Sequence, residues 1–316
     1  MRNARVLAVV VCVMAVVNTA SADTFGSGVN EFTIDFVPVS GSTNPTSGIP
    51  AGYGFTFTGV NYDYRMGRFE ITNDQWSKFT NIYGTPTGSS SSAYDGSPYW
   101  TGTNVPTNEV SWYEAAQFVN YLNTSKGYSQ AYKFTGTQGQ SDYTFMPWDV
   151  TDTGYDAGDP YRNSNAFYFL PTENEWVKAG YWNGTALQTY ALKAGESLTQ
   201  GNGTSGTGWN YYTTHVGYAT SPFGPWTVGS GSGELNGTFD MMGNVFEWTE
   251  MMVYNSERGL RGGSYHADYG PSYLESSCRI NGNPSDEYDF LGFRVASVPE
   301  PATVLLFGLG AVLLRK

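Results

Sequence analysis

The sequence predicts a mixed α+β domain that is rich in loops and packed through aromatic side chains. Three short helical patterns with the same kind of start signal alternate with aromatic, strand-like segments. The 39 glycines and the 16% of aromatic residues are typical of a turn-rich extracellular domain rather than a helical cytosolic enzyme. At 316 residues the chain is long enough to bury a sizeable core, and no fixed-period repeat indicates a solenoid or propeller.

Strand-like segments precede the first helical pattern. Residues 32–37 and 53–57 alternate loosely between turn residues, which predicts edge strands and loops. Residues 64–71 alternate more clearly and predict a strand that runs directly into a helix.

Each predicted helix begins with a capping box, in which a hydroxyl N-cap and a Glu or Gln three residues later bind each other's backbone amides. Ile71 and Trp76 add a hydrophobic staple to the first helix, and Gly84 ends it. The three boxes pair Thr72 with Gln75, Ser111 with Glu114, and Thr172 with Glu175.

Long stretches rich in Gly, Ser, Thr and Asn separate these elements, at residues 84–104, 136–165 and 183–236. Loops of this length are either functional or poorly ordered. Packed irregular structure is favoured over disordered linkers because these loops contain Trp100, Trp148, Trp209 and Trp226. We find no interior domain boundary.

The first residues have the pattern of a secretory signal peptide. Two arginines precede an apolar run at residues 6–17, and small residues at 20–22 supply a cleavage site. We therefore predict a signal peptide over residues 1–22 and a mature chain that begins near Asp23. The apolar run is short for a retained membrane anchor.

The last residues form a second targeting pattern. A Pro-Glu-Pro motif at 299–301 is followed by apolar residues 302–314 and two terminal cations, a tail that is short for a permanent span. Residues 298–316 resemble the PEP-CTERM sorting signal of Gram-negative bacteria. The resemblance implies transient inner-membrane anchoring, cleavage by an exosortase-type enzyme, and delivery to the cell surface or extracellular matrix.

Charge and cysteine content exclude several functions. Lys and Arg total 16 against 28 Asp and Glu, which argues against nucleic-acid binding because that requires clustered cations. Cys12 lies in the predicted signal peptide, so Cys278 is the only cysteine of the mature chain. Neither an intramolecular disulfide nor two-thiolate chemistry is then available.

The segment Asp240-Met-Met-Gly-Asn-Val-Phe-Glu-Trp248 combines two carboxylates, a glycine and large apolar residues. If Asp240 and Glu247 offer oxygens while the turn at Gly243 aligns backbone carbonyls, the segment can wrap a hard cation such as calcium. The alternative is a tight turn after a short strand, with Glu247 paired to an arginine.

Five segments taken in order resemble the sulfatase-modifying-factor family, whose founding member is the formylglycine-generating enzyme. The resemblance covers residues 64–297, with residues 23–63 as a lead-in of strands. It implies a C-type-lectin-like α+β fold with little regular secondary structure. The segments lie at residues 64–76, 108–118, 170–176, 239–248, and 261–264 with 291–295.

The resemblance does not extend to the catalytic residues of this family. Its oxidase members bind copper through two cysteines after an Arg-Gly-Gly-Ser motif, where this chain has residues such as Ala267 and Ser272. Copper and the formylglycine-generating oxidation are therefore not expected, although other enzyme activity stays open. Another branch binds nonheme iron through histidines, and His215 and His266 with Asp268 form the one such ligand set here, without a supporting spacing.

The resemblance does extend to a structural calcium site of the family. It implies that the ion is bound by the side chains of Asp240 and Glu247 and by the backbone carbonyls of Gly243 and Val245. The family's second calcium site is not carried over, because residues 216–222 lack an acid.

The arginines of the family motifs are expected to be structural. A buried arginine needs a carboxylate to balance its charge. The arginines are Arg261, Arg279 and Arg294, and the candidate partners are Glu173, Glu175 and Glu247.

The sequence as a whole favours an exported, calcium-stabilised binding or matrix module. Its partners are the exosortase and a surface polysaccharide or protein ligand, because aromatic and hydroxyl side chains stack on sugars or hold polypeptides. The alternative is a nonheme metal-dependent oxidoreductase of the same family, which uses His215 or His266.

Overall fold

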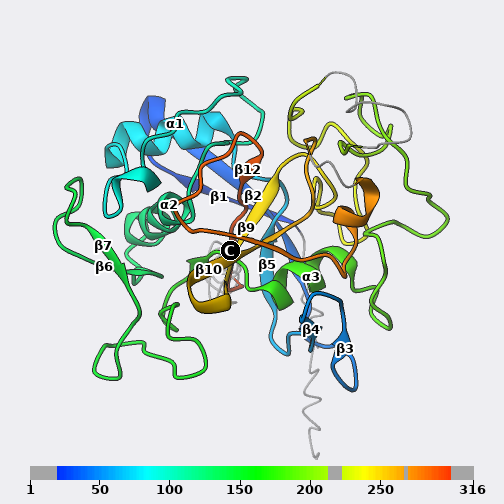
Figure 1. Cartoon of the computed structure of the whole chain (residues 1–316), viewed down its shortest axis with the longest axis horizontal. Coiled ribbons are helices and arrows are strands. Elements are labelled where there is room, and N and C mark those ends of the chain that lie inside the picture. Colours follow the sequence, from blue (N-terminus) through cyan, green and yellow to red (C-terminus); the bar gives the residue numbers. More distant parts are fainter. Residues whose placement is uncertain (1–19, 213–222, 267–269, 300–316) are drawn as a thin grey trace, which may run out of the picture.

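The computed structural model describes residues 20–212, 223–266 and 270–299. Two helices lie over one sheet, a second sheet crosses the centre of the molecule, and long loops fill the remainder (Figure 1). No helix in the described ranges has the length and apolar character needed to cross a membrane.

The larger sheet is antiparallel and has the strand order β1-β2-β5-β13-β8. Phe32, Ile34 and Phe36 on one face of β2 pack under the helices, while Val37 and Val39 face a second core. The strands are β1 (Ser21–Phe25), β2 (Phe32–Val39), β5 (Tyr64–Gly67), β8 (Tyr168–Phe169) and β13 (Ala296–Ser297).

Two predictions about these strands were wrong in detail. β2 is an interior strand and not an edge, because it pairs with β1 on one side and β5 on the other. β5 ends at Gly67 instead of residue 71, because Gly67 and Ile71 donate hydrogen bonds to Val295 and Phe293 outside any regular ladder.

The smaller sheet has the order β11-β10-β9-β12, with β12 parallel to β9. A register shift between Arg258 and Leu260 bends the β9–β10 hairpin. The strands are β9 (Phe246–Val253), β10 (Glu257–Arg261), β11 (Ile280–Gly282) and β12 (Leu291–Gly292).

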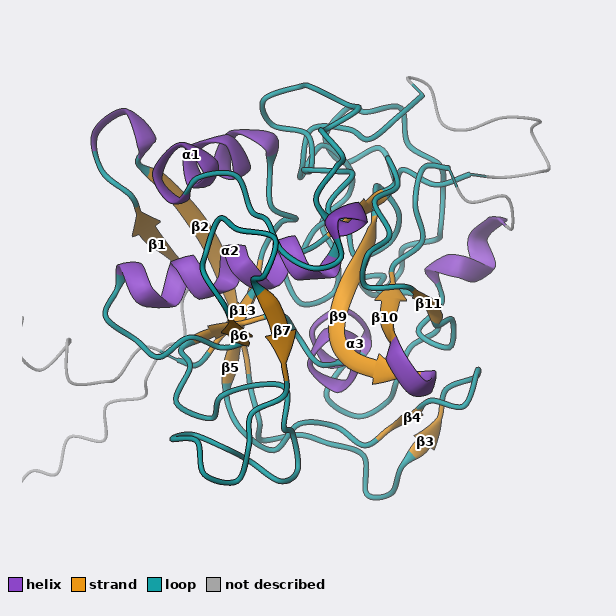
Figure 2. Ribbon diagram, turned by 60° about the vertical axis from the view of Figure 1, so that its left-hand side comes forward, coloured by secondary structure: helices purple, strands orange, loops and turns teal. Residues whose placement is uncertain are grey.

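The helices are α1 (Asn73–Tyr83), α2 (Trp112–Ser125) and α3 (Glu173–Tyr181), and each has the predicted capping box. α1 ends at Gly84, whose φ of 90° suits a glycine. Figure 2 shows α2 lying across the larger sheet, while α3 packs beside β9.

Short hairpins and packed loops complete the domain. Two minor sheets pair β3 (Ile49–Pro50) with β4 (Thr56–Phe57) and β6 (Lys133–Thr135) with β7 (Thr144–Met146). Trp209 and Trp226 are buried, so the described part of the stretch 183–236 is packed irregular structure as predicted, whereas Trp100 and Trp148 in the other two stretches are half-buried. Short 3-10 helices lie at η1 (Gly28–Asn30), η2 (Ser91–Ala93), η3 (Tyr254–Ser256) and η4 (Gly270–Leu274).

Candidate functional site

The segment from Asp240 to Trp248 is a strained turn that leads into β9. Asp240 and Asn244 both have a φ of 62°, and Gly243 has a φ of 99°. A Cβ on Gly243 would lie 2.0 Å from the carbonyl oxygen of Asn210, so only glycine fits there. The turn therefore fixes the backbone carbonyls of this segment in one arrangement.

Glu247 forms the ion pair with an arginine that was the alternative to calcium binding at this segment. Its Oε1 lies 2.5 Å from Arg294 Nη2, and its Oε2 accepts hydrogen bonds from Arg294 Nε at 2.6 Å and Trp176 Nε1 at 2.7 Å. All three side chains are buried. The carboxylate of Glu247 is thus already balanced within the protein.

Glu70 is a partner of the same turn that the sequence did not reveal. Its Oε2 accepts a hydrogen bond from Asn244 Nδ2 at 2.6 Å, and its Oε1 accepts one from the Val245 amide at 3.1 Å. The residue lies in the first family segment, 174 positions from Asn244. A pattern of neighbouring residues in the sequence cannot predict a contact between positions so far apart.

Buried carboxyl groups outnumber buried cations around the turn. Burial raises the pKa of Glu234 to about 8 and that of Asp240 to about 6, while Arg294 lowers both. Burial and the charges of Asp240 and Glu247 raise the pKa of Glu70 well above its usual range. One guanidinium therefore faces four carboxyl groups.

The calcium expected at this turn fits its residues in part. Asp240 Oδ2 accepts a hydrogen bond from Gly229, and a cation beside Asp240 would offset the buried negative charge. Within the described ranges no donor reaches the carbonyl oxygens of Gly243 or Val245, which leaves both as potential ligands. Glu247 is the weaker part of the set, because Arg294 and Trp176 already occupy its oxygens.

The remaining family arginines are structural, as predicted. Glu173 accepts hydrogen bonds from Arg261 Nε at 2.9 Å and from Arg279 Nε at 2.9 and 3.0 Å. Glu175, the other candidate partner, instead lies 3.4 Å from Arg162 Nη1. Through Arg261 and Arg279, Glu173 connects α3 to β10 and to the segment that leads into β11.

Cys278 is a buried side chain rather than a reactive thiol. Burial raises its pKa to about 11, so the thiol is neutral near neutral pH. Of the positions that match the family's catalytic cysteines, Ser272 is exposed in η4 and Ala267 lies outside the described residues. His215 and Asp268 also lie outside them, whereas His266 is exposed.

A group of rings, which we name the aromatic platform, lies beside the segment that follows the Arg-Gly-Gly-Ser motif. Four of its rings are exposed, two are half-buried, and that of Tyr265 is buried. His266 stacks on Phe290 with 5.4 Å between ring centroids and an interplanar angle of 4°. Tyr288 stacks on the same Phe290 ring at 5.2 Å and 8°. The platform comprises Tyr99, Trp100, Phe223, Tyr265, His266, Tyr288 and Phe290.

Hydrogen bonds fix the base of the platform. Trp100 Nε1 donates to the Tyr265 hydroxyl at 2.7 Å, and that hydroxyl donates to Asp289 Oδ2 at 2.7 Å. Tyr99, Phe223 and Tyr288 remain 64%, 56% and 51% exposed above this base. Because the rings come from four separate segments, sequence reasoning did not bring them together.

The fold and the turn define a domain of the formylglycine-generating-enzyme type. Residues 58–298 match the family model described as the sulfatase-modifying factor enzyme 1-like domain. The chain belongs to that family, as the sequence motifs predicted. Residues 297–316 match the PEP-CTERM protein-sorting motif, which implies exosortase processing and sorting to the cell surface.

Solved structures share the fold at low sequence identity, and no curated protein matches the chain. The Treponema denticola variable protein 1 is 20% identical with a TM-score of 0.56, over 89% of this chain and 100% of that one. CarF is 22% identical with a TM-score of 0.57, over 84% and 99%. PvdO from Pseudomonas aeruginosa is 16% identical with a TM-score of 0.52, over 89% and 92%.

Proposed function

We propose that the protein is a binding module of the bacterial cell surface, and that the aromatic platform contacts its ligand. The observation that carries this proposal is that the exposed rings flank the segment where the family's oxidases place their copper-binding cysteines. This chain has no cysteine in that segment, since Cys278 is buried beyond it. Oxidation of a substrate cysteine by a thiolate-bound copper is therefore not its activity.

A neutral surface polysaccharide is the ligand that the platform fits best. Aromatic faces contact the apolar face of a sugar ring, and exposed Tyr288 and Tyr99 offer such surfaces. Asp289 anchors the platform, and burial together with the charge of Asp289 raises the pKa of nearby Glu109. This acidic surrounding disfavours an anionic polymer.

Glycan-array screening of the purified protein, followed by calorimetry on each hit, tests the proposal. We expect Tyr288→Ala to weaken binding of a neutral glycan roughly tenfold, whereas Tyr53→Ala, which removes another exposed tyrosine from the β3–β4 turn, leaves it unchanged. If the protein binds polypeptides but no glycan, the ligand of the platform is a polypeptide and not a sugar. Equal losses in both variants would remove the platform from the proposal.

Metal analysis separates this function from that of a metal-dependent oxidoreductase. Stoichiometric iron or copper that is lost on His266→Ala would overturn the binding-module proposal. We further propose calcium as a structural ion, held by Asp240 and the carbonyls of Gly243 and Val245, with Glu247 behind them. Export of a Gram-negative type, with transient inner-membrane anchoring by residues 298–316, completes the proposal.

A further inference from the structure

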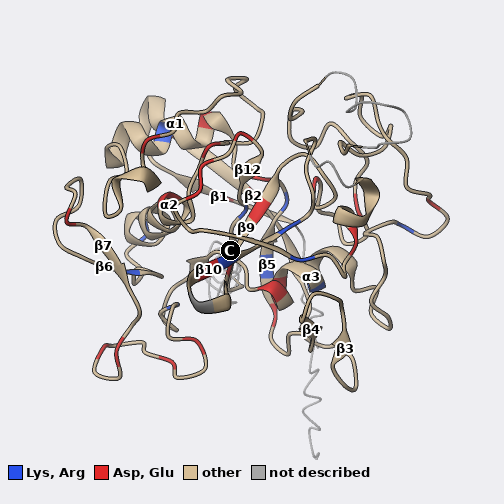
Figure 3. Cartoon of the chain, viewed as in Figure 1, with Lys and Arg blue, Asp and Glu red and all other residues tan. Residues whose placement is uncertain are grey.

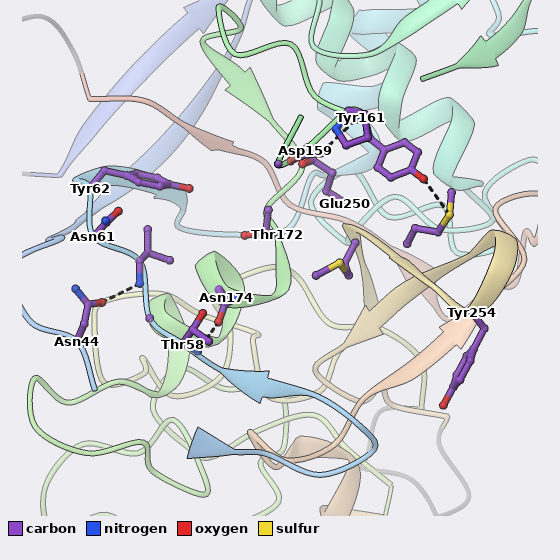
Figure 4. Close-up of a pocket in the computed structure, with 16 residues that line it drawn as sticks. Asn44, Thr58, Asn61, Tyr62, Asp159, Tyr161, Thr172, Asn174, Glu250 and Tyr254 are labelled. Carbon is purple, nitrogen blue, oxygen red and sulfur yellow. Dashed lines mark hydrogen bonds between the residues drawn. The ribbon is translucent and has the colours of Figure 1, made fainter. Parts of the chain in front are cut away.

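A cavity lies at the other end of β9, away from the aromatic platform. It has a volume of about 740 Å³ and is open to solvent. Figure 4 shows Tyr62 on one wall, Thr172 and Asn174 from the start of α3 on another, and Asp159 beside Glu250 on a third. Phe246 touches the platform ring Phe290, so β9 spans the distance between the two sites.

Carboxyl groups outnumber cations around this cleft. Arg162 lies behind it, with Nη1 3.4 Å from Glu175 Oε1 and Nε 3.4 Å from Glu250 Oε1 and 3.7 Å from Asp159 Oδ2. These distances are long beside the 2.5 Å of the Arg294 to Glu247 pair. One guanidinium is thus shared among three carboxylates, and none of them is tightly paired with it. Asp159 continues a run of acids in the loop between β7 and β8, at the lower left of Figure 3.

Glu250 has hydrogen-bonding capacity to spare. Its side chain is 2% exposed, and Oε2 accepts a hydrogen bond from the Tyr132 hydroxyl at 2.7 Å. Its Oε1 accepts no hydrogen bond within the described residues, although Arg162 is nearby. Burial raises the pKa of this carboxyl well above its usual range and Arg162 opposes the rise, while the charge of Asp159 and a hydrogen bond with its carboxyl group add to it. A buried acceptor without a donor costs free energy that a ligand donor would recover.

The other lining groups fit an organic cation rather than an anion or a bare metal ion. Tyr62, Tyr161 and Tyr254 supply aromatic rings that favour contact with a cation. Met251 and Met252 supply soft, polarisable surface for an alkyl stem. No lysine or arginine lines the cleft, and no cluster of metal-ligating side chains occurs in the described residues.

We propose that the cleft binds a ligand through a primary ammonium group, which donates hydrogen bonds to Asp159 and Glu250. The shared chemistry occurs in lysine side chains, in polyamines and in amino sugars. This site does not depend on the aromatic platform, so failure of glycan binding there would leave it standing.

Calorimetry on the full chain with cadaverine, lysine amide and glucosamine tests the proposal and distinguishes the three sources. The fully N-acetylated form of each compound, in which both amines of cadaverine and of lysine amide are acetylated, serves as a neutral control. We expect the free amines to bind and the acetylated compounds to bind at least roughly tenfold more weakly. Equal binding of the neutral forms, or no binding of any amine at millimolar concentration, would overturn the proposal.

Two aspartates in one loop provide matched variants. Asp159→Asn removes a carboxylate from the cleft and keeps the acceptor for the Tyr161 amide. Asp156→Asn removes the same charge from an exposed position and keeps the acceptor for the Gly158 amide. We expect only Asp159→Asn to weaken amine binding, by roughly tenfold or more, with unchanged thermal stability. An equal loss of amine binding in both variants would indicate a long-range electrostatic effect and would refute the proposed site.

Discussion

Glu234 offers the sharpest test of the electrostatics at the Asp240 turn. Its Oε1 accepts a hydrogen bond from the Met242 amide at 2.9 Å, and its Oε2 accepts one from the Thr238 hydroxyl at 3.0 Å. The side chain is fully buried. Glu234→Gln keeps the shape, because the amide oxygen can accept from Met242 while the amide nitrogen donates to the Thr238 oxygen.

The expected effect follows from the raised pKa. Burial moves the pKa of Glu234 from 4.5 to about 8, so the folded state holds a proton that the unfolded state releases. Stability is therefore highest below the unfolded pKa of 4.5 and falls as the pH rises toward 8. At about 1.4 kcal/mol per pKa unit, the loss amounts to roughly 5 kcal/mol once both states are ionised.

Urea unfolding from about pH 4 to pH 9 in the presence of a chelator measures this loss. We expect the wild-type protein and Glu234→Gln to be similarly stable in acid, and the variant to be more stable by several kcal/mol at the alkaline end. Glu196→Gln, which changes an exposed carboxyl, is the control. If the free energy of unfolding depends on pH in the same way for the wild-type protein and for Glu234→Gln, then Glu234 is not a buried, protonated carboxyl group.

Three further predictions concern other buried groups. Calcium should raise the melting temperature of the wild-type protein but not that of Asp240→Asn, and an equal rise in both would remove Asp240 from the ion site. Cys278 should react with a thiol reagent at about pH 8 only after unfolding, because burial raises its pKa to about 11; rapid reaction of the native protein would contradict this. Arg294→Met should lower the free energy of unfolding by about 3–5 kcal/mol, since Glu247 would lose its partner, and adding Glu247→Gln should restore part of the loss. Urea unfolding of the single and double variants measures the last effect, and strict additivity would count against the pair.

The sequence predicted the features that depend on neighbours within a few residues. The capping boxes at Thr72, Ser111 and Thr172 span three positions each, so their side chains meet their amide partners without help from the fold. The family motifs extended this reach by marking Arg294 as a buried arginine and Glu247 as one of three candidate partners, although which carboxylate meets which arginine stayed open; the two lie 47 positions apart. The capping boxes and the carboxylate pairing of the motif arginines are confirmed.

Contacts between distant segments escaped prediction where no motif connected them. Glu70 supports the Asp240 turn from the first family segment, and Arg162 is shared among three carboxylates that lie before, within and after α3. The interior position of β2 was missed for the same reason, because its neighbours β1 and β5 belong to different stretches of the chain. Alternation along one strand reports which faces are buried but not how many partners the strand has.

The buried ion pairs explain how this scaffold can carry new surface chemistry. Arg294 holds β9 through Glu247, and Arg261 holds α3 through Glu173, both inside the protein and independent of the exposed loops. The packing of β9 does not depend on the copper-binding cysteines of the family. This chain has no cysteine at their positions, and Cys278 is a free, buried side chain. The platform at one end and the acidic cleft at the other can therefore change their residues while the turn from Asp240 to Trp248 stays fixed. That separation makes a binding function compatible with the intact fold of an oxidase family.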